Sequence, residues 1–192
     1  MVGLLPLILA SGSPRRQLLL EQLNINFVVC AADSDGPVVS DNPETRVAGH
    51  ALFKAQQVAA NNPQRFVLAG DTLVYGDGEF FGKPADRRQA RQMLLRLQEI
   101  GEHRVYTATC LLSDQLQVFQ VVNYAVVRFS EVPQPELDLY LTGTEWCDKA
   151  GAYAIQGWAG QYASCVSGDF DNIVGMSPID VKKLFAESGF QY

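Results

Sequence analysis

The sequence has no long hydrophobic run of the kind that enters a membrane. Its longest apolar stretch near the N-terminus, Val2 to Ala10, contains Gly3 and Pro6 and falls short of the roughly 20 residues that a spanning helix needs. No basic residue precedes this stretch, and Arg15 and Arg16 follow it, which is the reverse of the order in a secretory signal. We therefore predict a cytoplasmic protein without a membrane partner.

The sequence also lacks paired cysteines and an excess of positive charge. Its cysteines are scattered without a CxxC pair, which argues against a zinc cluster and a disulfide scaffold. The net charge of -6 argues against tight non-specific binding of nucleic acid, which requires a basic patch. A small phosphorylated ligand needs only a few basic groups placed locally, so it remains compatible with this composition.

The length and the alternation of apolar patterns predict an α/β fold with a mixed sheet. A chain of 192 residues with 47% hydrophobic content can bury one substantial core, so we expect a single domain over residues 1–192. Predicted strands cover Leu5–Ala10, Phe66–Ala69 and Leu73–Tyr75, with a hairpin of Arg104–Ser113 and Gln117–Phe129. Predicted helices begin at Pro14 and after Asp86, and cover Pro43–Asn61, Pro135–Leu141 and Pro178–Ser188.

The first strand leads into a turn and helix start that are suited to an anion. Ser11 and Ser13 flank Gly12, Ser13 is a natural N-cap, and Arg15 and Arg16 lie in the first helical turn. The free N–H groups and the helix dipole favour an anion here, whereas the same dipole disfavours the arginines. A phosphate gripped by the guanidinium groups would offset that cost. The alternative is a capped helix with two solvated arginines.

Two further charged residues lie where apolar neighbours are expected. Lys54 falls in the apolar stripe of the second helix, so it must extend to solvent or find a charged partner. Asp71 follows the apolar run Phe66–Ala69, and the predicted strand therefore ends on a carboxylate, where ligands bind in α/β sheets. A turn residue is the plainer interpretation of Asp71.

Lys83 and the segment 148–157 complete the candidate site residues. Lys83 is presented by Gly82 and Pro84, and it reaches the same pocket only if the turn at Gly76–Gly78 folds back. The segment from Asp148 to Gly157 combines glycines with polar groups that suit a base or sugar; the alternative is an ordinary strand with a turn at each end.

Taken together, these segments resemble the Maf family of nucleotide pyrophosphatases over nearly the whole chain. The matching stretches, in order, are LASGSPRRQLLL, AGHALFKA, AGDTLV, GKPAD, EHRVYTAT, DKAGAYAIQG and GDFDNIVGMSP. The resemblance implies a fold similar to that of inosine triphosphate pyrophosphatases, with a long mixed sheet between two lobes, flanking helices and the active site in the cleft. It also implies a homodimer.

The resemblance assigns roles residue by residue. It makes Asp71 the proton acceptor. Our hypothesis adds that Asp71 and the triphosphate oxygens hold Mg²⁺ or Mn²⁺, with help from the Asp33/Asp35 region. The resemblance connects Arg15, Thr72 and Gln156 with the choice of base. It implies that Ser11, Arg16, Lys54 and Lys83 handle the phosphates. The family usually has a glutamate where this chain reads Ala32-Asp33-Ser34-Asp35-Gly36, so Asp33 or Asp35 takes its place.

The resulting functional prediction is hydrolysis of dTTP or UTP to the monophosphate and pyrophosphate. The form DKAGAYAIQG, with Gln156, resembles the branch that prefers these pyrimidines. The predicted role is nucleotide pool sanitation or cell division arrest. Two alternatives stay open: a pyrophosphatase for 7-methyl-GTP or other modified nucleotides, and a weakly catalytic nucleotide sensor that regulates septum formation.

Overall fold

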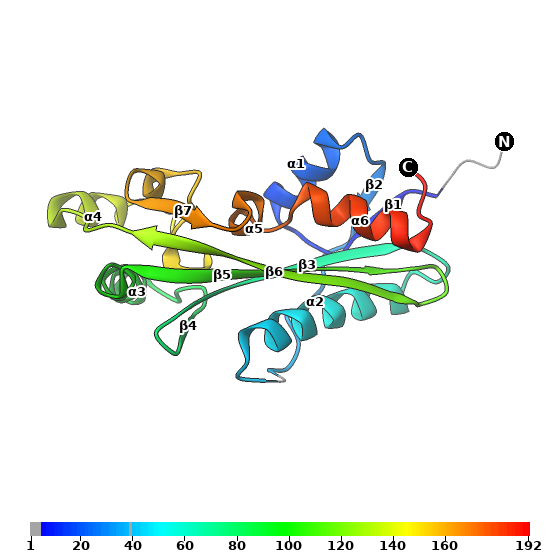
Figure 1. Cartoon of the computed structure of the whole chain (residues 1–192), viewed down its shortest axis with the longest axis horizontal. Helices are drawn as coiled ribbons and strands as arrows, with labels where there is room; N and C mark the ends of the chain where they lie inside the picture. The colour runs from blue at the N-terminus through cyan, green and yellow to red at the C-terminus, as the bar shows by residue number, and fades with distance from the viewer. Residues whose placement is uncertain (1–4, 39) are drawn as a thin grey trace. The chain divides into compact units, whose positions relative to one another are not determined.

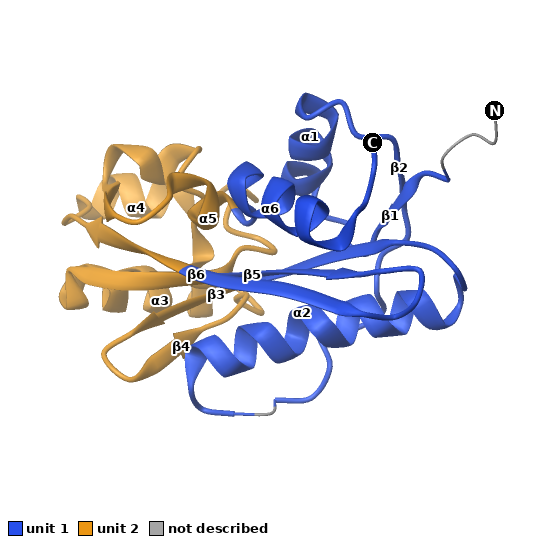
Figure 2. Cartoon of the chain, turned by 45° about the vertical axis from the view of Figure 1, so that its right-hand side comes forward, with its two compact units in different colours: residues 1–71, 107–123, 175–192 blue, residues 72–106, 124–174 orange. Residues whose placement is uncertain are grey.

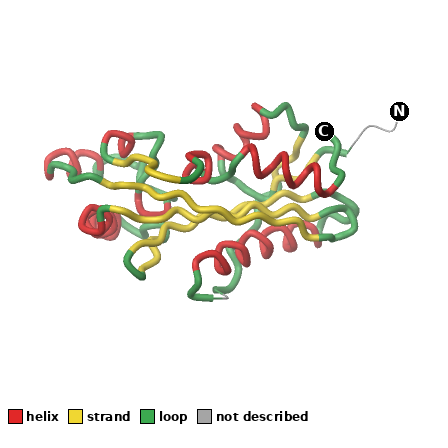
Figure 3. Tube along the Cα trace, in the orientation of Figure 1, coloured by secondary structure: helices red, strands yellow, loops and turns green. Residues whose placement is uncertain are grey.

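The computed structural model describes residues 5–38 and 40–192, in which helices and strands alternate as predicted (Figures 1 and 3). The strands are β1 (Leu7–Leu9), β2 (Phe27–Val29), β3 (Val67–Gly76), β4 (Glu79–Phe81), β5 (Glu102–Leu112), β6 (Val118–Phe129) and β7 (Ala163–Ser167). The helices are α1 (Pro14–Gln22), α2 (Pro43–Ala60), α3 (Arg87–Ile100), α4 (Gln134–Tyr140), α5 (Phe170–Val174) and α6 (Pro178–Ser188), with short 3-10 helices η1 (Ala150–Ala152) and η2 (Trp158–Gln161). The apolar stretch predicted from Val2 begins outside the described residues.

The strands of the described residues form one mixed sheet, as predicted. The order is β2-β1-β3-β5-β6-β7, and β4 pairs with β3 at its side. Strand β1 is parallel to both β2 and β3, whereas β4 is antiparallel to β3 and β7 is antiparallel to β6. The predicted hairpin is confirmed in outline: β5 and β6 are neighbours, and Ser113 and Gln117 close their connection through a backbone hydrogen bond of 3.0 Å.

Most helix starts lie where the capping residues predict them. Asn42 accepts a hydrogen bond from the Thr45 backbone at the start of α2, and Asp86 accepts one from the Gln89 backbone at the start of α3. Ser13 occupies the N-cap position of α1, but its side chain makes no capping bond. The Ser13 backbone N–H instead donates to the Ser11 hydroxyl at 3.3 Å, so the capping prediction is right in position and wrong in chemistry.

Strand β3 corrects the prediction that a strand ends before Asp71. The strand is continuous from Val67 to Gly76, so Asp71 lies inside it and not at its end. Gly70 does not turn the chain. A Cβ atom there would lie 2.9 Å from Met176 Cε and 3.0 Å from Arg16 Nε, so the glycine makes room for side chains that pack against the strand. Asp71 is therefore carried by a regular strand, which restricts its backbone.

The described chain divides into two compact units (Figure 2). Unit 1 contains the described residues up to 71, with 107–123 and 175–192, and unit 2 contains residues 72–106 and 124–174. Strands β3, β5 and β6 each contribute residues to both units. The single domain expected over residues 1–192 stays a prediction.

Unit 1 has a layer of helices on each face of its strands. In Figures 1 and 2, α2 lies along one face, and α1 and α6 lie on the other. The core beneath α1 and α6 is formed by buried apolar side chains from helices and strands: Leu7, Leu9, Leu20, Ile25, Leu68, Leu111, Met176, Val181, Leu184 and Phe185. On the other face, the Gln120 side chain donates to the Ala48 carbonyl at 2.8 Å and so links β6 to α2.

Unit 2 has its own apolar core. Helix α3 contributes Ala90, Leu94 and Leu97, which are fully buried at helical spacing. Strands β5 and β6, helix α4 and the segment that contains Tyr153 complete the core. None of the helices in residues 5–38 and 40–192 is both long enough and apolar enough to span a membrane.

Candidate functional site

The turn after β1 turns one arginine inward. Arg16 donates from Nε to the Gly175 carbonyl at 3.0 Å and from a terminal nitrogen to the Ser11 hydroxyl at 2.9 Å. Pro14 at the first helical position fixes the start of α1, so this side chain lies over Gly70 of β3. The alternative of two solvated arginines is therefore wrong for Arg16, and both arginines are only partly exposed.

Electrostatics explain how these two cations are accommodated at a helix N-terminus. Burial lowers the pKa of Arg16, while the carboxylates of Asp71 and Asp35 act in the opposite direction and Arg15 lowers it further. Burial also lowers the pKa of Arg15. A guanidinium stays protonated in proteins, so the two arginines keep a positive charge on the partly buried start of α1. An additional anion at this position would be stabilised.

Lys54 finds the charged partner that its place in the apolar stripe demands. Its ammonium group lies 2.6 Å from Asp71 Oδ1 and 2.6 Å from Asp35 Oδ1, so it bridges two carboxylates. The Lys54 side chain is 12% exposed and that of Asp71 is 10% exposed, whereas that of Asp35 is 59% exposed. The bridge therefore joins a buried carboxylate to one that faces solvent.

The structure decides between the two acidic residues in the loop before α2. The Asp35 carboxylate reaches Lys54, while Asp33 contributes its backbone N–H, which donates to the Gln57 side chain at 2.9 Å. Gly36 has a φ of +83° and lies against the Phe53 ring, where an added Cβ would come within 2.5 Å of a ring carbon. This tight packing holds the loop on α2 and places Asp35 beside Lys54.

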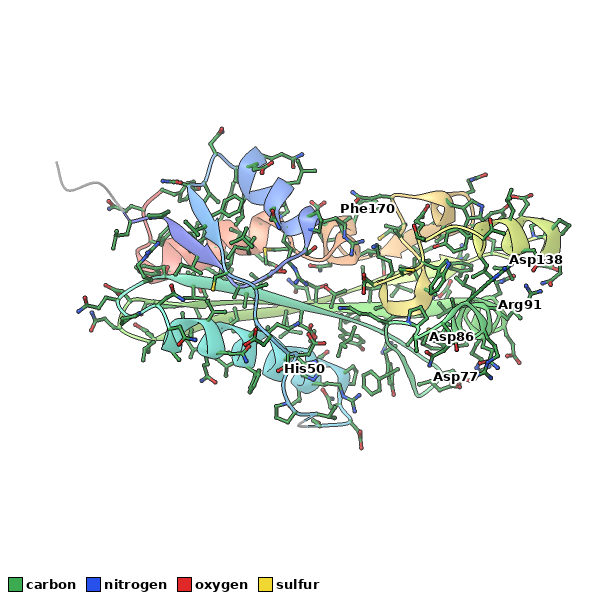
Figure 4. All side chains as sticks on the ribbon, turned by 180° about the vertical axis from the view of Figure 1, so that it is seen from behind. His50, Asp77, Asp86, Arg91, Asp138 and Phe170 are labelled. Atoms are coloured by element: carbon green, nitrogen blue, oxygen red, sulfur yellow. The ribbon has the colours of Figure 1, made fainter. Side chains whose placement is uncertain are left out.

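His50 also contacts Asp71, although it was not among the site residues predicted from the sequence. His50 is labelled in Figure 4 and lies one turn before Lys54 on α2. Its Nδ1 atom is 3.1 Å from Asp71 Oδ2. The ring is 8% exposed. The available signal was its spacing of four residues from Lys54, which places both side chains on one face of a helix.

The surroundings of Asp71 hold it in the ionised state. Burial raises the pKa of this carboxyl, but the hydrogen bond from His50 and the nearby charges of Lys54 and Arg16 outweigh burial, so the pKa lies below its ordinary value. The hydrogen bonds occupy both oxygens, one with Lys54 and the other with His50. Asp71 is therefore a buried anion with Lys54 at one oxygen and His50 at the other.

Unit 2 contains the remaining predicted site residues. Thr72 follows Asp71 on β3 and is partly buried, and Lys83 and Gln156 are exposed. The Gly151 N–H donates to the Gly82 carbonyl at 3.1 Å, so the structure brings the predicted segments around Lys83 and Gln156 together. Unit 1 contains the other predicted site residues and brings them together through hydrogen bonds, an ion pair and nearby charges: Ser11, Arg15, Arg16, Lys54 and Asp71.

The segment 148–157 is not the ordinary strand that was weighed as an alternative. It contains η1, and Gly151 adopts a φ of +72°. Two tyrosine hydroxyl groups anchor the segment: Tyr153 is 2.6 Å from His103 Nε2, and Tyr140 donates to the Ala152 carbonyl at 3.0 Å. These bonds fix the backbone that presents Gln156.

Metal-ligating side chains do not gather into a cage. In residues 5–38 and 40–192, no group of three or more histidines, cysteines, aspartates or glutamates is arranged to hold a metal ion. Asp71 and Asp35 nevertheless converge on one cation, the Lys54 ammonium. Two carboxylates of this kind suit a hard divalent ion that takes its other ligands from water and phosphate.

Solved structures with low sequence identity share the fold. A nucleoside-triphosphatase described as a dITP/XTP pyrophosphatase, from Mycobacterium abscessus, matches with a TM-score of 0.52 and 12% identity over 96% of each chain. The Ham1 protein of Staphylococcus aureus matches with a TM-score of 0.52 and 13% identity over 96% of this chain and 100% of its own. This likeness confirms the predicted similarity to the inosine triphosphate pyrophosphatase fold.

Curated relatives are much closer in sequence. A dTTP/UTP pyrophosphatase of Halalkalibacterium halodurans is 44% identical over 89% of this chain and 90% of the relative. A dTTP/UTP pyrophosphatase of Symbiobacterium thermophilum is 40% identical over 96% of this chain and 94% of the relative. The sequence model of the family described as "Maf-like protein" matches residues 6–188. The predicted resemblance is confirmed, and the chain belongs to the Maf family.

Proposed function

We propose that this chain is a nucleoside triphosphate pyrophosphatase that hydrolyses dTTP and UTP to the monophosphate and pyrophosphate. The observation that carries the proposal is the buried, ionised Asp71, which Lys54 joins to Asp35. Curated relatives named for this reaction, at 44% and 40% identity, support it. Hydrolysis of an acid anhydride needs a base for water and positive charge for the phosphates, and the cluster contains both.

In the proposed reaction, a water molecule attacks the α-phosphorus, and the bond from that phosphorus to the bridging oxygen breaks. Asp71 accepts the proton of the water, and pyrophosphate leaves with the electron pair of the broken bond. Lys54 must first release Asp71 Oδ1, because both carboxylate oxygens are engaged in the ligand-free chain. The triphosphate offers the Lys54 ammonium an alternative set of anionic oxygens.

The cationic residues stabilise the phosphate charge. Arg15 and Arg16 flank the start of α1, where Ser11 and the free backbone N–H groups add hydrogen-bond donors. Lys54 and Lys83 supply ammonium groups. Charge stabilisation of this kind is usually the largest single contribution to catalysis, so we propose these five residues as the phosphate-binding set.

A divalent cation, Mg²⁺ or Mn²⁺, fits the same carboxylates. Asp71 would hold it with help from Asp35, and the cation would supply Lewis-acid stabilisation of the phosphate oxygens. Lys54 would then be displaced from the carboxylates, in agreement with its proposed transfer to the phosphates.

The base preference is assigned to Thr72, Gln156 and Arg15. An amide offers one acceptor and two donors, so Gln156 can complement the imide edge that thymine and uracil share. Thr72 adjoins Asp71 on β3, which links placement of the nucleoside to the reaction. We also propose that residues 1–192 act as one domain, which agrees with the family match over residues 6–188. The cytoplasmic homodimer and the role in nucleotide pool sanitation or division arrest stay predictions.

A substrate panel tests the proposal. Pyrophosphate release is measured with dTTP, UTP, ATP, GTP and 7-methyl-GTP in Mg²⁺ or Mn²⁺, and again after exhaustive treatment with a chelator. We expect kcat/KM for dTTP and UTP to exceed that for ATP and GTP by more than about 200-fold, which is beyond what apolar shape alone provides. Gln156→Ala should reduce this preference more than it reduces turnover.

Each result of the panel has a distinct meaning. Highest kcat/KM with 7-methyl-GTP would contradict the preference for dTTP and UTP but would retain the pyrophosphatase reaction. Tight nucleotide binding without pyrophosphate release would indicate the sensor that was predicted as an alternative. Full activity without a divalent cation would exclude the metal from the mechanism.

A further inference from the structure

His50 and Lys54 approach Asp71 from the same helix but differ in how firmly they are held. The two residues lie one turn apart on α2, with His50 at Oδ2 of the carboxylate and Lys54 at Oδ1. The Lys54 side chain is long and also pairs with Asp35, which is largely exposed. The His50 side chain is about as buried as that of Lys54, but it is shorter and Asp71 is its one carboxylate partner, so it has fewer alternative positions than Lys54.

The second ring nitrogen of His50 indicates why packing alone does not explain a histidine here. Nε2 is buried and has no hydrogen-bond partner among the described residues. An unsatisfied buried polar atom costs about 1 to 3 kcal/mol, and a leucine would avoid that cost. Its neighbours on the buried face of α2, Val47 and Ala51, are apolar. The polar contact that the ring does make is the one with Asp71.

The chemistry of the contact fixes which atom donates. An ionised carboxylate accepts hydrogen bonds and cannot donate them, so the proton lies on His50 Nδ1. A donor fixed at Oδ2 limits rotation of the carboxylate about its χ2 angle. Oδ1 is then left facing Lys54 and, through it, Asp35.

We propose that His50 is a positioning residue that holds Asp71 by its Oδ2 atom, so that Oδ1 keeps its orientation when Lys54 leaves. The inference rests on the proposed function, in which Asp71 Oδ1 is the group that acts. His50 touches neither substrate nor water in this scheme. Its contribution is the orientation of the carboxylate during turnover.

Two substitutions separate orientation from packing. His50→Asn places an amide N–H near the position of Nδ1, whereas His50→Leu fills the space without a donor. We expect His50→Leu to lower kcat for dTTP by about 10-fold or more, because misplaced reacting groups cost rates of that order. The KM should stay within about twofold, and His50→Asn should recover most of the lost kcat.

Stability provides the internal control. His50→Leu removes the unsatisfied nitrogen but leaves Asp71 Oδ2 without its donor, so a cooperative thermal unfolding transition must be retained for the loss of kcat to be attributed to orientation. Gln56→Leu, which adds the same side chain at an exposed position of α2, should leave kcat unchanged. Wild-type kcat in His50→Leu, or equal losses in the leucine and asparagine variants, would overturn the proposal.

A second measurement does not depend on activity. The chain has two histidines, so the ¹⁵N signals of the His50 ring are assigned by their loss in His50→Leu. A proton on Nδ1 is expected, with a change in its signal in Asp71→Asn. A ring protonated on Nε2 alone would overturn the inference even if the enzyme cleaves dTTP. A protonated Nδ1 in a chain that cleaves no triphosphate would preserve the contact and refute the proposed function.

Discussion

Asp71 combines two properties that oppose one another in a general base. Its lowered pKa keeps it ionised at neutral pH and so ready to accept a proton, but the same shift makes it a weaker base. The hydrogen bond from His50 and the charge of Lys54 are the main groups that counter burial. Transfer of Lys54 to a phosphate would remove one of these groups, whereas a divalent cation held by Asp71 would again favour the ionised carboxylate.

The first prediction concerns this carboxylate. Asp71→Asn nearly preserves the shape of the side chain but removes its charge, so the variant should fold and lose turnover by about 10² to 10⁴. Pyrophosphate release from dTTP measures the loss, and circular dichroism verifies the fold. The matched control is Asp77→Asn, which changes an exposed aspartate that pairs with Arg96 at the turn after β3 (Figure 4). Turnover of Asp71→Asn within twofold of the wild type would remove Asp71 from the mechanism.

At the scale of residues, the sequence indicates which charged residues belong to the site better than it indicates which residues they pair with. Lys54 in an apolar stripe predicts either extension to solvent or a charged partner, and the structure shows the second, with Asp71 as a partner. The choice between Asp33 and Asp35 depends on the course of the loop, which Gly36 and Phe53 determine by packing. His50 carries no charge anomaly in the sequence. Its proposed role follows from the contact between its Nδ1 atom and Asp71 Oδ2, two groups that come together only when the chain folds.

At the scale of elements, helices were more predictable than strands. Capping residues and apolar spacing mark the starts of α2 and α3, because both signals are local. Strand β3 continues through Gly70 and Asp71, and Gly70 there leaves room for Arg16 and Met176, which come from elsewhere in the chain. The order of strands likewise depends on pairing between distant segments, so the pattern predicted a mixed sheet without its order.

The second prediction concerns Gly168, which follows β7. It has a φ of +85°, and an added Cβ would lie 2.6 Å from the Tyr124 carbonyl oxygen and 2.7 Å from Ala125 Cα on β6. Backbone atoms cannot yield as a side chain does. Gly168→Ala should therefore lower the free energy of unfolding by more than the about 1 to 2 kcal/mol expected from the left-handed conformation alone.

Gly78 provides the control for that measurement. Its φ is +80°, and an added Cβ meets nothing within 4 Å. Gly78→Ala therefore carries the conformational strain without the steric contact. Urea unfolding of both variants separates the two effects. Equal decreases in the free energy of unfolding would show that contact between the added Cβ of Gly168→Ala and β6 has no steric cost.

At the scale of the whole molecule, a buried histidine links stability to pH. Burial lowers the pKa of His103 from its ordinary value of 6.5 to about 4, in a site where its Nε2 atom contacts the Tyr153 hydroxyl. The unfolded chain binds a proton at His103 below pH 6.5, while the folded chain does not until about pH 4. Stability from this residue is therefore full above pH 6.5 and falls as the pH decreases to about 4.

The third prediction follows from this linkage. The free energy of unfolding should fall by about 3 kcal/mol between pH 7 and pH 4 because of His103, since each unit of pKa corresponds to about 1.4 kcal/mol. His103→Gln keeps a polar partner for Tyr153 but does not titrate. Urea unfolding across this pH range should give a flatter profile for the variant, because the contributions of the carboxylates cancel in the comparison. Parallel profiles would contradict the assignment.

The apolar core of unit 1 also has a consequence for biosynthesis. It joins Leu7 and Leu9 of β1 to Val181, Leu184 and Phe185 of α6, which are among the most distant parts of the described sequence. The ribosome releases β1 and α1 first, and their apolar surfaces meet α6 only after residues 178–188 have emerged. Until then, the nascent chain exposes the surfaces that favour aggregation. Unit 1 therefore cannot complete its core until α6 has left the ribosome, and its earlier segments stay exposed to aggregation during that interval.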